Sequence, residues 1–146
     1  MLCIKDLSIG ELEKWLKESA EPSYRTKQIF QWLYPKAVND FSQMTNLSLE
    51  LRNKLTKAFS LSALKEVTKQ VSSDKTEKFL FATSDNQTIE TVVMPYHNRC
   101  TICVSTQVGC RYGCRFCASG ADGFKRNLTQ AEILDQIIHV RQSGHE

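Results

Sequence analysis

The amino-acid sequence predicts an α/β protein with an N-terminal helical module, a small β meander and the start of a larger α/β domain. Three observations lead to this fold class. Apolar residues recur at helical spacing in the first 60 residues, and they alternate with other residues in the stretch that follows. A predicted strand then runs into a loop rich in Cys and Gly, and a further helical pattern comes after it. We therefore expect three domains, at 1–60, 61–95 and 96–146, of which the last is incomplete.

The composition is that of a globular protein. Of the 146 residues, 41% are hydrophobic and 24% are charged, which excludes wholesale disorder. No run approaches the ~18 apolar residues of a membrane-spanning helix, and the first six residues do not resemble a secretory signal. We expect a cytoplasmic protein without a membrane partner. The net charge of +3 permits a nucleic-acid partner but does not require one.

The first 60 residues predict three short helices. Ser8 and Glu11 have the spacing of a capping box, and an apolar stripe follows them. A second helix is expected between Pro22 and Pro35, and a third begins near residue 46. The side chains that we expect these helices to bury together are Trp15, Phe30, Trp32 and Leu55.

The next segment changes from helical period to alternation. Runs at 79–83 and 89–94 predict half-buried strands of an antiparallel meander. In the second run, Glu90 lies opposite the face that carries Ile89 and Thr91. Turn-forming residues flank the first run, at 72–75 and 84–87.

The last segment predicts one strand–loop–helix unit. Its strand is expected at 101–105, and Thr129 with Glu132 forms a second capping box before the helix. The apolar stripe expected on this helix consists of Ile133, Leu134, Ile137 and Ile138. A single unit cannot form a parallel sheet, so we expect the chain to be a fragment of a longer protein.

The cysteines point to a metal site. Five of the six lie between Cys100 and Cys117, and clustered cysteines in a chain without a secretory signal more often bind metal or do chemistry than form disulfides. Cys110, Cys114 and Cys117 have the spacing C-x3-C-x2-C. Thiolates suit iron–sulfur clusters and zinc. Three ligands would leave one iron of a four-iron cluster open to bind a small molecule and pass it an electron.

Two alternatives remain open from the residues alone. Cys100-x2-Cys103 and Cys114-x2-Cys117 have the form of two zinc knuckles, which would make the chain a non-catalytic RNA-binding module and leave Cys110 unused. The other alternative is a loop of reduced cysteines without metal.

The cysteine motif, with Phe116 before its last cysteine, resembles the signature of radical S-adenosylmethionine enzymes. Its flanks at 101–110 and 123–129 are similar to those of the dual-specificity 23S rRNA and tRNA adenine C2-methyltransferases. The resemblance implies a helical RNA-binding domain followed by a partial (β/α) barrel of the radical-SAM type, truncated here. Earlier segments that also fit this family are Tyr24-Arg25, 31–34, Phe41, Met44-Thr45 and 90–92.

The resemblance implies cofactors and partners. Cys110, Cys114 and Cys117 match the three ligands of a [4Fe–4S] cluster, whose open iron binds S-adenosylmethionine, and Phe116 matches a residue near the adenine of that molecule. The implied partners are 23S rRNA, tRNA and an electron donor such as flavodoxin, and the implied state is a monomer. Cys3 and Cys100 match no role in the family.

The resemblance also implies two catalytic residues. Cys103 matches a cysteine that resolves a protein–RNA crosslink, and Glu90 matches the proton acceptor that is needed when C2 of adenine loses its hydrogen. From the residues alone, the alternatives are a packed strand cysteine for Cys103 and a solvated strand carboxylate for Glu90.

Basic and aromatic residues are interleaved around the cysteines, as suits a polyanion with exposed bases, although an ordinary solvated loop has the same composition. They are Arg99, Arg111, Arg115, Lys125, Arg126, Tyr96, Tyr112 and Phe124. The cations of the helical module that could hold RNA are Arg25, Lys27, Arg52, Lys54 and Lys57.

The family's methyl-carrying cysteine and most of its S-adenosylmethionine pocket have no counterpart in these 146 residues. We therefore expect the fragment to be inactive alone. Within the superfamily, methylation at C8 of adenine in 23S rRNA is the alternative activity.

Overall fold

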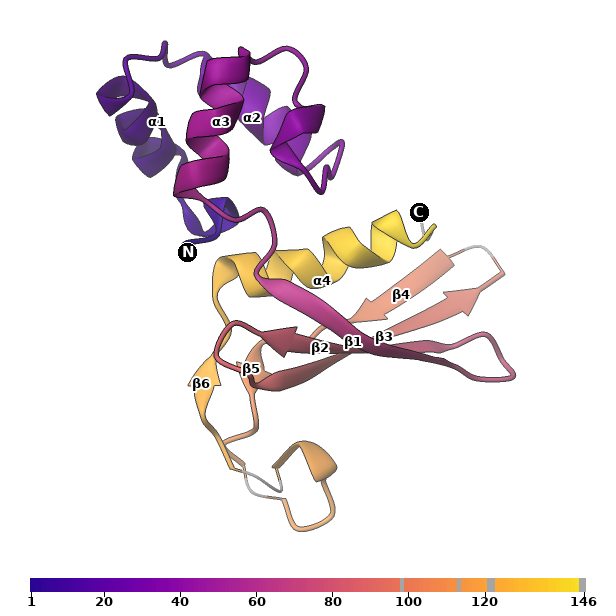
Figure 1. Ribbon diagram of the computed structural model, residues 1–146. Helices are drawn as coiled ribbons and strands as arrows, with labels where there is room; N and C mark the ends of the chain where they lie inside the picture. Colours follow the sequence, from indigo (N-terminus) through magenta and orange to yellow (C-terminus); the bar gives the residue numbers. More distant parts are fainter. Residues whose placement is uncertain (98, 113, 121–122, 145–146) are drawn as a thin grey trace. The chain divides into compact units, whose positions relative to one another are not determined.

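The computed structural model describes residues 1–97, 99–112, 114–120 and 123–144 (Figure 1). The chain divides into two compact units, Met1–Ser62 and Ala63–Glu146. Within the described residues, no helix combines the length and the apolar character that a membrane span requires.

The first unit is helical, and its core consists mainly of aliphatic side chains. Leu12, Leu16 and Leu55 are fully buried in it. Trp15, Phe30 and Trp32 pack against this core but are only partly buried, so the expected aromatic core is instead an aliphatic one. The elements of this unit are η1 (Ile4–Asp6), α1 (Ile9–Glu18), α2 (Arg25–Leu33), η2 (Phe41–Gln43) and α3 (Leu49–Ala58).

Local capping explains where two of these helices begin. Ser8 accepts a hydrogen bond from the Glu11 amide, and the Glu11 carboxylate accepts one from the Ser8 amide, so the predicted capping box at the start of α1 is confirmed. Ser48 caps α3 by accepting from the Leu51 amide.

The second unit is a four-stranded sheet with one helix and a small two-stranded ladder. The sheet order is β1-β2-β3-β4, and each neighbouring pair is antiparallel. The elements are β1 (Leu64–Val71), β2 (Glu77–Thr83), β3 (Thr88–Tyr96), β4 (Arg99–Cys103), β5 (Gln107–Val108), η3 (Ala118–Gly120), β6 (Arg126–Asn127) and α4 (Gln130–Gln142).

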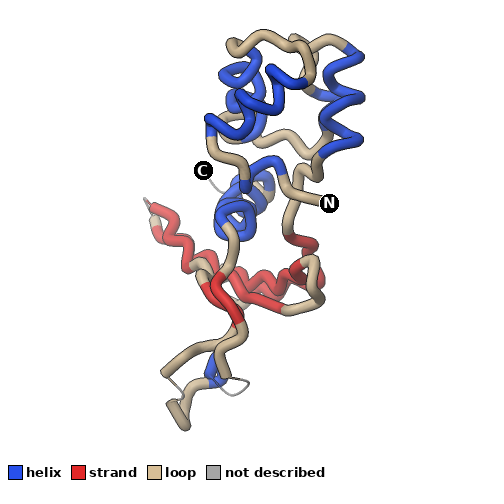
Figure 2. The backbone as a smooth tube through the Cα atoms, turned by 90° about the vertical axis from the view of Figure 1, so that its left-hand side faces the viewer, coloured by secondary structure: helices blue, strands red, loops and turns tan. Residues whose placement is uncertain are grey.

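Helix α4 covers one face of this sheet, as the ribbon and tube views show (Figures 1 and 2). Phe79 and Phe81 stack on each other on that face, and the ring of His139 from α4 meets both edge-on. Ile89 and Val93 of β3 share their buried cluster with Val140 of α4. The predicted meander is therefore present, and α4 supplies the other half of its core.

The predicted capping box of α4 is confirmed, and its predicted stripe is correct only in part, since Ile138 is buried and Ile133 packs against the apolar cluster. Thr129 and Glu132 exchange the expected hydrogen bonds. Ile137 is exposed, whereas Glu132, Asp135 and Gln136 are buried. These polar side chains are buried because each finds a hydrogen-bonding partner elsewhere in the unit, as described below.

Other strands differ from the prediction in extent. β4 covers Arg99–Cys103, two residues before the expected strand at 101–105, and it pairs with β3 as the edge of the antiparallel sheet. β1 is exposed along nearly its whole length and has no alternating signal in the sequence. The chain is thus a mixed α/β protein, while the assignment of 96–146 to the start of a barrel stays a prediction.

We predict that Phe79→Ala lowers the free energy of unfolding by about 3–5 kcal/mol, because it removes a fully buried ring from the contact between sheet and helix. Urea denaturation followed by circular dichroism measures this. Val67→Thr, at a site that is 55% exposed on β1, serves as the control and should change the value by less than ~0.5 kcal/mol. Equal effects of the two substitutions would contradict this account of the core.

Candidate functional site

Glu90 and Cys103 lie on the same face of the sheet, opposite α4. Glu90 pairs with Leu80 in the ladder between β2 and β3, and Cys103 pairs with Val92, two residues further along β3. Because side chains alternate along a strand, Glu90, Val92 and Cys103 share one face. Both candidate catalytic side chains are exposed there.

The Glu90 carboxylate has a cationic partner on the same face. Its Oε1 lies 3.1 Å from Nζ of Lys78 on β2, and both side chains are about half-exposed. Ser105 also donates its hydroxyl to the Glu90 carbonyl at 2.7 Å. These contacts connect Glu90 to the neighbouring strand and to the segment that follows β4.

A cavity of about 470 Å³ joins Glu90 to the cysteine-bearing part of the chain. Most of its walls are polar side chains and backbone from β3 and from the segment before the first cysteine of the motif. Its lining residues include Leu80, Gln87, Glu90, Ser105, Thr106, Gln107, Gly109, Cys110, Ala118 and Lys125.

The three motif cysteines lie in the segment 109–124, here called the cysteine loop, of which Gly113, Ala121 and Asp122 are outside the described residues. Cys110 and Cys117 are partly buried, Cys114 is exposed, and all three are free thiols. The Cys117 amide donates to the Cys114 carbonyl at 3.1 Å, so these two cysteines share one tight turn.

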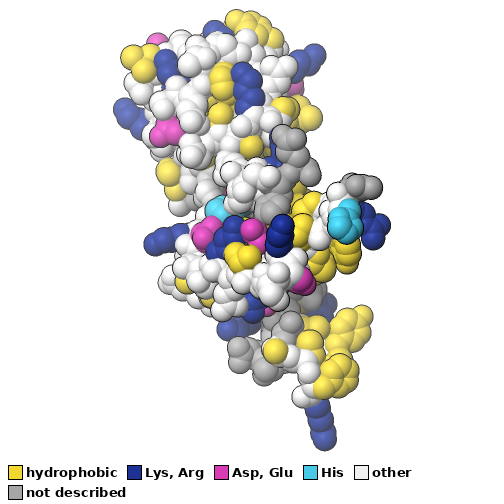
Figure 3. All heavy atoms as spheres, turned by 90° about the vertical axis from the view of Figure 1, so that its right-hand side faces the viewer, with side chains coloured by type: hydrophobic (Ala, Val, Ile, Leu, Met, Phe, Trp, Pro, Cys, Tyr) yellow, Lys and Arg dark blue, Asp and Glu magenta, His cyan; other side chains and the backbone are white. Residues whose placement is uncertain are grey.

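The tip of the cysteine loop carries large apolar side chains in solvent. Tyr112 is 88% exposed and Phe116 is 93% exposed. In Figure 3, yellow side chains project into solvent at the lower end of the molecule, over this loop. The guanidinium of Arg111 stacks on the ring of Phe124 at 4.0 Å from its centre, which places a cation at the returning side of the loop.

Register on β4 argues against the zinc-knuckle alternative. Cys100 lies on the α4 side of the sheet and packs against the buried cluster there, whereas Cys103 points to the other face. Residues three apart on a strand face opposite sides. The two thiols of the first proposed knuckle therefore do not meet.

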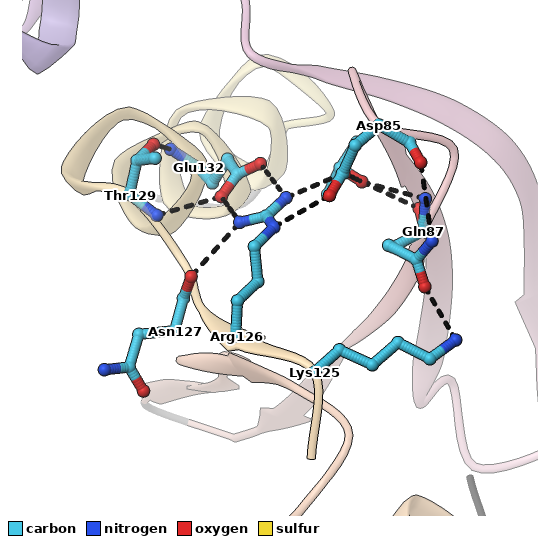
Figure 4. Close-up of polar contacts among 8 residues, drawn as sticks. Asp85, Gln87, Lys125, Arg126, Asn127, Thr129 and Glu132 are labelled. Carbon is cyan, nitrogen blue, oxygen red and sulfur yellow. Dashed lines mark hydrogen bonds and ion pairs between the residues drawn. The ribbon is translucent and has the colours of Figure 1, made fainter. Parts of the chain in front are cut away.

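The cysteine loop returns to the fold through Arg126, one of the basic residues that could face a polyanion or simply lie in a solvated loop. Its guanidinium donates to both oxygens of Asp85 at 2.9 and 2.8 Å, and to both oxygens of Glu132 at 2.8 Å (Figure 4). The two carboxylates are far apart in sequence, so spacing alone does not reveal this contact.

This arrangement shifts the pKa values of all three groups. Hydrogen bonds from Arg126 and Thr83 hold the pKa of the Asp85 carboxyl well below its usual range. Burial raises the pKa of the Glu132 carboxyl, but hydrogen bonds from Arg126 and Thr129 outweigh it and leave that pKa lowered. The contacts with Glu132 and Asp85 raise the pKa of Arg126.

A second polar contact fixes the segment between β4 and the cysteine loop. The buried amide of Gln136 accepts from the Ser105 amide at 2.8 Å and donates to the Ser105 carbonyl at 2.9 Å. The same oxygen accepts from the Thr91 hydroxyl at 2.8 Å. The sequence analysis did not single out Gln136, because a glutamine on a helix has no apolar signal.

In the first unit, three of the five candidate RNA-binding cations already make contacts. Arg25 donates to Gln28 and to the Asn46 carbonyl, Arg52 donates to the Ser42 carbonyl, and Lys54 pairs with Glu50. The other two, Lys27 and Lys57, are exposed.

Comparison with known proteins finds similar sequences over nearly the whole chain. Residues 3–61 match the model of the ribosomal RNA large subunit methyltransferase N-terminal domain. The chain is 54% identical over 143 residues to the probable dual-specificity RNA methyltransferase RlmN of Halalkalibacterium halodurans, and 51% identical to that of Bacillus licheniformis. The predicted resemblance is confirmed. The chain is related to the RlmN family.

The structural comparison agrees with this relationship. A crystal structure of a radical SAM methyltransferase from Sphaerobacter thermophilus superimposes with a TM-score of 0.89 and 41% identity, over 99% of this chain and 44% of the other. The two RlmN relatives are matched over 98% of this chain and 40% of their own length. The chain thus spans about two fifths of the curated relatives that it matches.

The donor set fits the cluster that the RlmN resemblance implies. Three free thiols come from one loop, and two of them share a turn; soft thiolates are the ligands of iron–sulfur clusters. Among the residues that the structure describes, no three His, Cys, Asp or Glu side chains are grouped so that they could hold a metal ion. Ligation would therefore require the loop to draw its three thiols together.

We predict that Asp85→Asn costs about 1 kcal/mol or less at neutral pH, because solvent screens this half-exposed pair. The folded-state pKa of Asp85 is lowered, so its contribution is present above its ordinary value of 3.8 and is lost as the pH falls below it. Urea denaturation at pH 7, 5 and 3 should show the same difference between wild type and variant at pH 7 and 5, and a smaller difference at pH 3, where the loss begins. A difference that stays constant from pH 7 to pH 3 would contradict the ion pair.

Proposed function

We propose that this chain is the cluster-bearing part of a radical S-adenosylmethionine methyltransferase that modifies C2 of adenine in 23S rRNA and tRNA. The similarity to RlmN relatives over 98% of the chain carries the proposal. The proposal extends to a [4Fe–4S] cluster, S-adenosylmethionine, a flavodoxin-like electron donor, a monomeric state and a cytoplasmic location. The 146 residues alone are proposed to be inactive.

The shared cavity supports a reaction site at this face of the sheet. Glu90 and Cys110 line the same cavity, and Cys103 lies on the same sheet face as Glu90. The proposed proton acceptor and the proposed cluster ligand thus border one cavity, and the thiol of Cys103 lies on the same sheet face as Glu90. These are the three kinds of group that the proposed chemistry requires of this part of the protein.

Cys110, Cys114 and Cys117 are the proposed ligands of the cluster, and Phe116 is proposed to lie beside the adenine of S-adenosylmethionine. When bound, the cluster supplies the electron for reductive cleavage of that cofactor. The exposed ring of Phe116 supports its assignment, since a ring that is 93% exposed is available to stack on a ligand.

Glu90 is the proposed proton acceptor at C2 of adenine. Its carboxylate is exposed, lines the cavity and lies 3.1 Å from the Lys78 ammonium. A carboxylate that borders a cavity can accept a proton from a ligand bound there. The thiol of Cys103, exposed on the same face, is proposed to resolve the covalent intermediate between protein and RNA.

The first unit is proposed to hold RNA. Its matched family model is that of an rRNA methyltransferase N-terminal domain, and the exposed Lys27 and Lys57 are available to phosphates. Adenine within folded RNA must leave its stack before its C2 is reached, so a separate RNA-holding unit serves the same reaction.

We predict that anaerobic reconstitution of the chain with iron and sulfide yields about four irons and four sulfides per chain, and that Cys114→Ala abolishes this. Metal and sulfide analysis measures the ratio. Cys100→Ala is the matched control and should leave the ratio unchanged, because Cys100 packs on the opposite face of the sheet.

The contrary outcome is equally definite. One tightly bound zinc without iron, lost in both Cys100→Ala and Cys103→Ala, would replace the cluster by a zinc module.

We predict that a full-length RlmN relative loses methylation turnover when the glutamate aligned with Glu90 becomes glutamine, by about 10²-fold or more. Alanine at the position aligned with Cys103 should stop turnover after the covalent protein–RNA intermediate. Mass spectrometry of the RNA and of the protein measures product and trapped intermediate. A full rate in either variant would remove the corresponding role, and methyl groups at C8 would replace the proposed C2 activity.

A further inference from the structure

The cysteine loop is closed at its base by a short two-stranded ladder, here called the stem. Its two strands are β5 and β6, in which Gln107 pairs with Asn127 and Val108 with Arg126. The Lys125 amide donates to the Val108 carbonyl at 3.0 Å, which extends the ladder towards the loop. At the loop end, Gly109 has φ +72°, and a Cβ there would lie 1.8 Å from the Gly123 carbonyl oxygen. Only glycine allows the two sides of the loop to approach this closely.

Arg126 connects this stem to two other elements. Asp85 lies in the turn between β2 and β3, and Glu132 lies in the first turn of α4. The planar guanidinium meets each carboxylate with two hydrogen bonds, as Figure 4 shows. Lys125, the adjacent residue, donates its ammonium to the Gln87 side chain at 2.7 Å in the same turn.

The position of this turn matters for the cavity. β3 begins at Thr88, directly after the turn, and Glu90 is its third residue. The turn residue Gln87 and the stem residue Lys125 both line the cavity, as do Glu90 and Cys110. The contact between stem and turn therefore links the two walls of the cavity, one carrying the carboxylate and the other the first motif cysteine.

We propose that the Asp85–Arg126–Glu132 cluster is a positioning device that fixes the base of the cysteine loop against the strand carrying Glu90. Arg126 is its positioning residue. The inference rests on the proposed function for the identity of the loop's ligand and the role of Glu90. The geometric link between stem and strand stands on the contacts themselves.

Other contacts already hold α4, so the cluster is not needed to dock the helix. Thr129 caps the start of α4. The rest of the helix is held on the sheet by the buried apolar cluster and by the hydrogen bonds of Gln136. What Arg126 adds is the connection from β6 to the turn. That connection runs through Asp85, which is half-exposed and is not needed to compensate a buried charge.

Asp85→Asn is therefore the decisive variant. It leaves the buried Glu132 paired with Arg126 and removes only the charged contact with the turn. Glu77→Gln is the matched control, because it also converts a carboxylate to an amide and cuts a 2.7 Å ion pair, with Lys69, in the same sheet. Arg126→Lys keeps the charge but loses the fork that engages both carboxylates.

Three measurements on the whole chain test the proposal. In the iron-free chain, amide exchange at Lys125 and the alkylation rate of Cys110 report the stem and the loop. In the reconstituted chain, iron loss to a chelator reports how firmly the loop holds its metal. We expect Asp85→Asn and Arg126→Lys to accelerate iron loss about tenfold, because outer contacts that support ligating groups contribute this much to metal affinity. In the iron-free chain, both variants should raise the rate of amide exchange at Lys125 and the alkylation rate of Cys110. Glu77→Gln should behave as wild type in all three measurements.

The outcomes separate this proposal from the proposed function. If the wild type holds iron and Asp85→Asn matches Glu77→Gln in all three measurements, the positioning role is overturned and the cluster assignment stands. If the wild type takes up no iron, the cluster assignment fails, and the two iron-free rates still decide whether Arg126 fixes the stem. Wild-type behaviour of Arg126→Lys would overturn the requirement for the guanidinium fork.

Discussion

The arrangement of the second unit depends on the buried amide of Gln136. It satisfies both backbone groups of Ser105 and the hydroxyl of Thr91, so one side chain of α4 joins β3 to the segment that leaves β4. Its neighbours extend this pattern, since Asp135 accepts from the Ala63 amide at 2.6 Å and Glu132 binds Arg126. A buried polar group without a partner costs far more than a satisfied one gains. Such a network therefore stabilises one register of helix on sheet and disfavours its neighbours.

This docking determines which face of the sheet is available for chemistry. α4 and the apolar cluster occupy the face that carries Phe79 and Ile89. Alternation along β3 then leaves Glu90 on the other face. Ser105 connects the two sides, because its backbone is held by Gln136 while its hydroxyl donates to the Glu90 carbonyl. Ser105, whose backbone Gln136 holds in place, thus directly contacts the backbone of Glu90, the candidate base.

Features set by neighbouring residues were predictable from the sequence, and features set by distant partners were not. The two capping boxes and the C-x3-C-x2-C motif are local, and the alternation around Glu90 correctly assigned its face. The stripe of α4 was only partly correct because periodicity counts apolar residues, whereas Gln136 is buried by partners 31 and 45 residues away. The contacts of Arg126 were not predictable for the same reason, since Asp85 lies 41 residues before it. The shared face of Glu90 and Cys103 required the pairing of β3 with β4, which a single sequence does not specify.

The cysteine loop combines a rigid base with an exposed tip, and this contrast is physically coherent with ligand binding. At the base, the guanidinium of Arg126 and the ammonium of Lys125 donate to partners within the unit. At the tip, the rings of Tyr112 and Phe116 are in solvent, where apolar surface has no favourable contact. Covering such rings releases free energy in proportion to the area removed from water, roughly 25 cal/mol per Å². A loop held at its base and apolar at its tip gains that energy when a ligand is bound, and it loses little entropy because its base is already ordered.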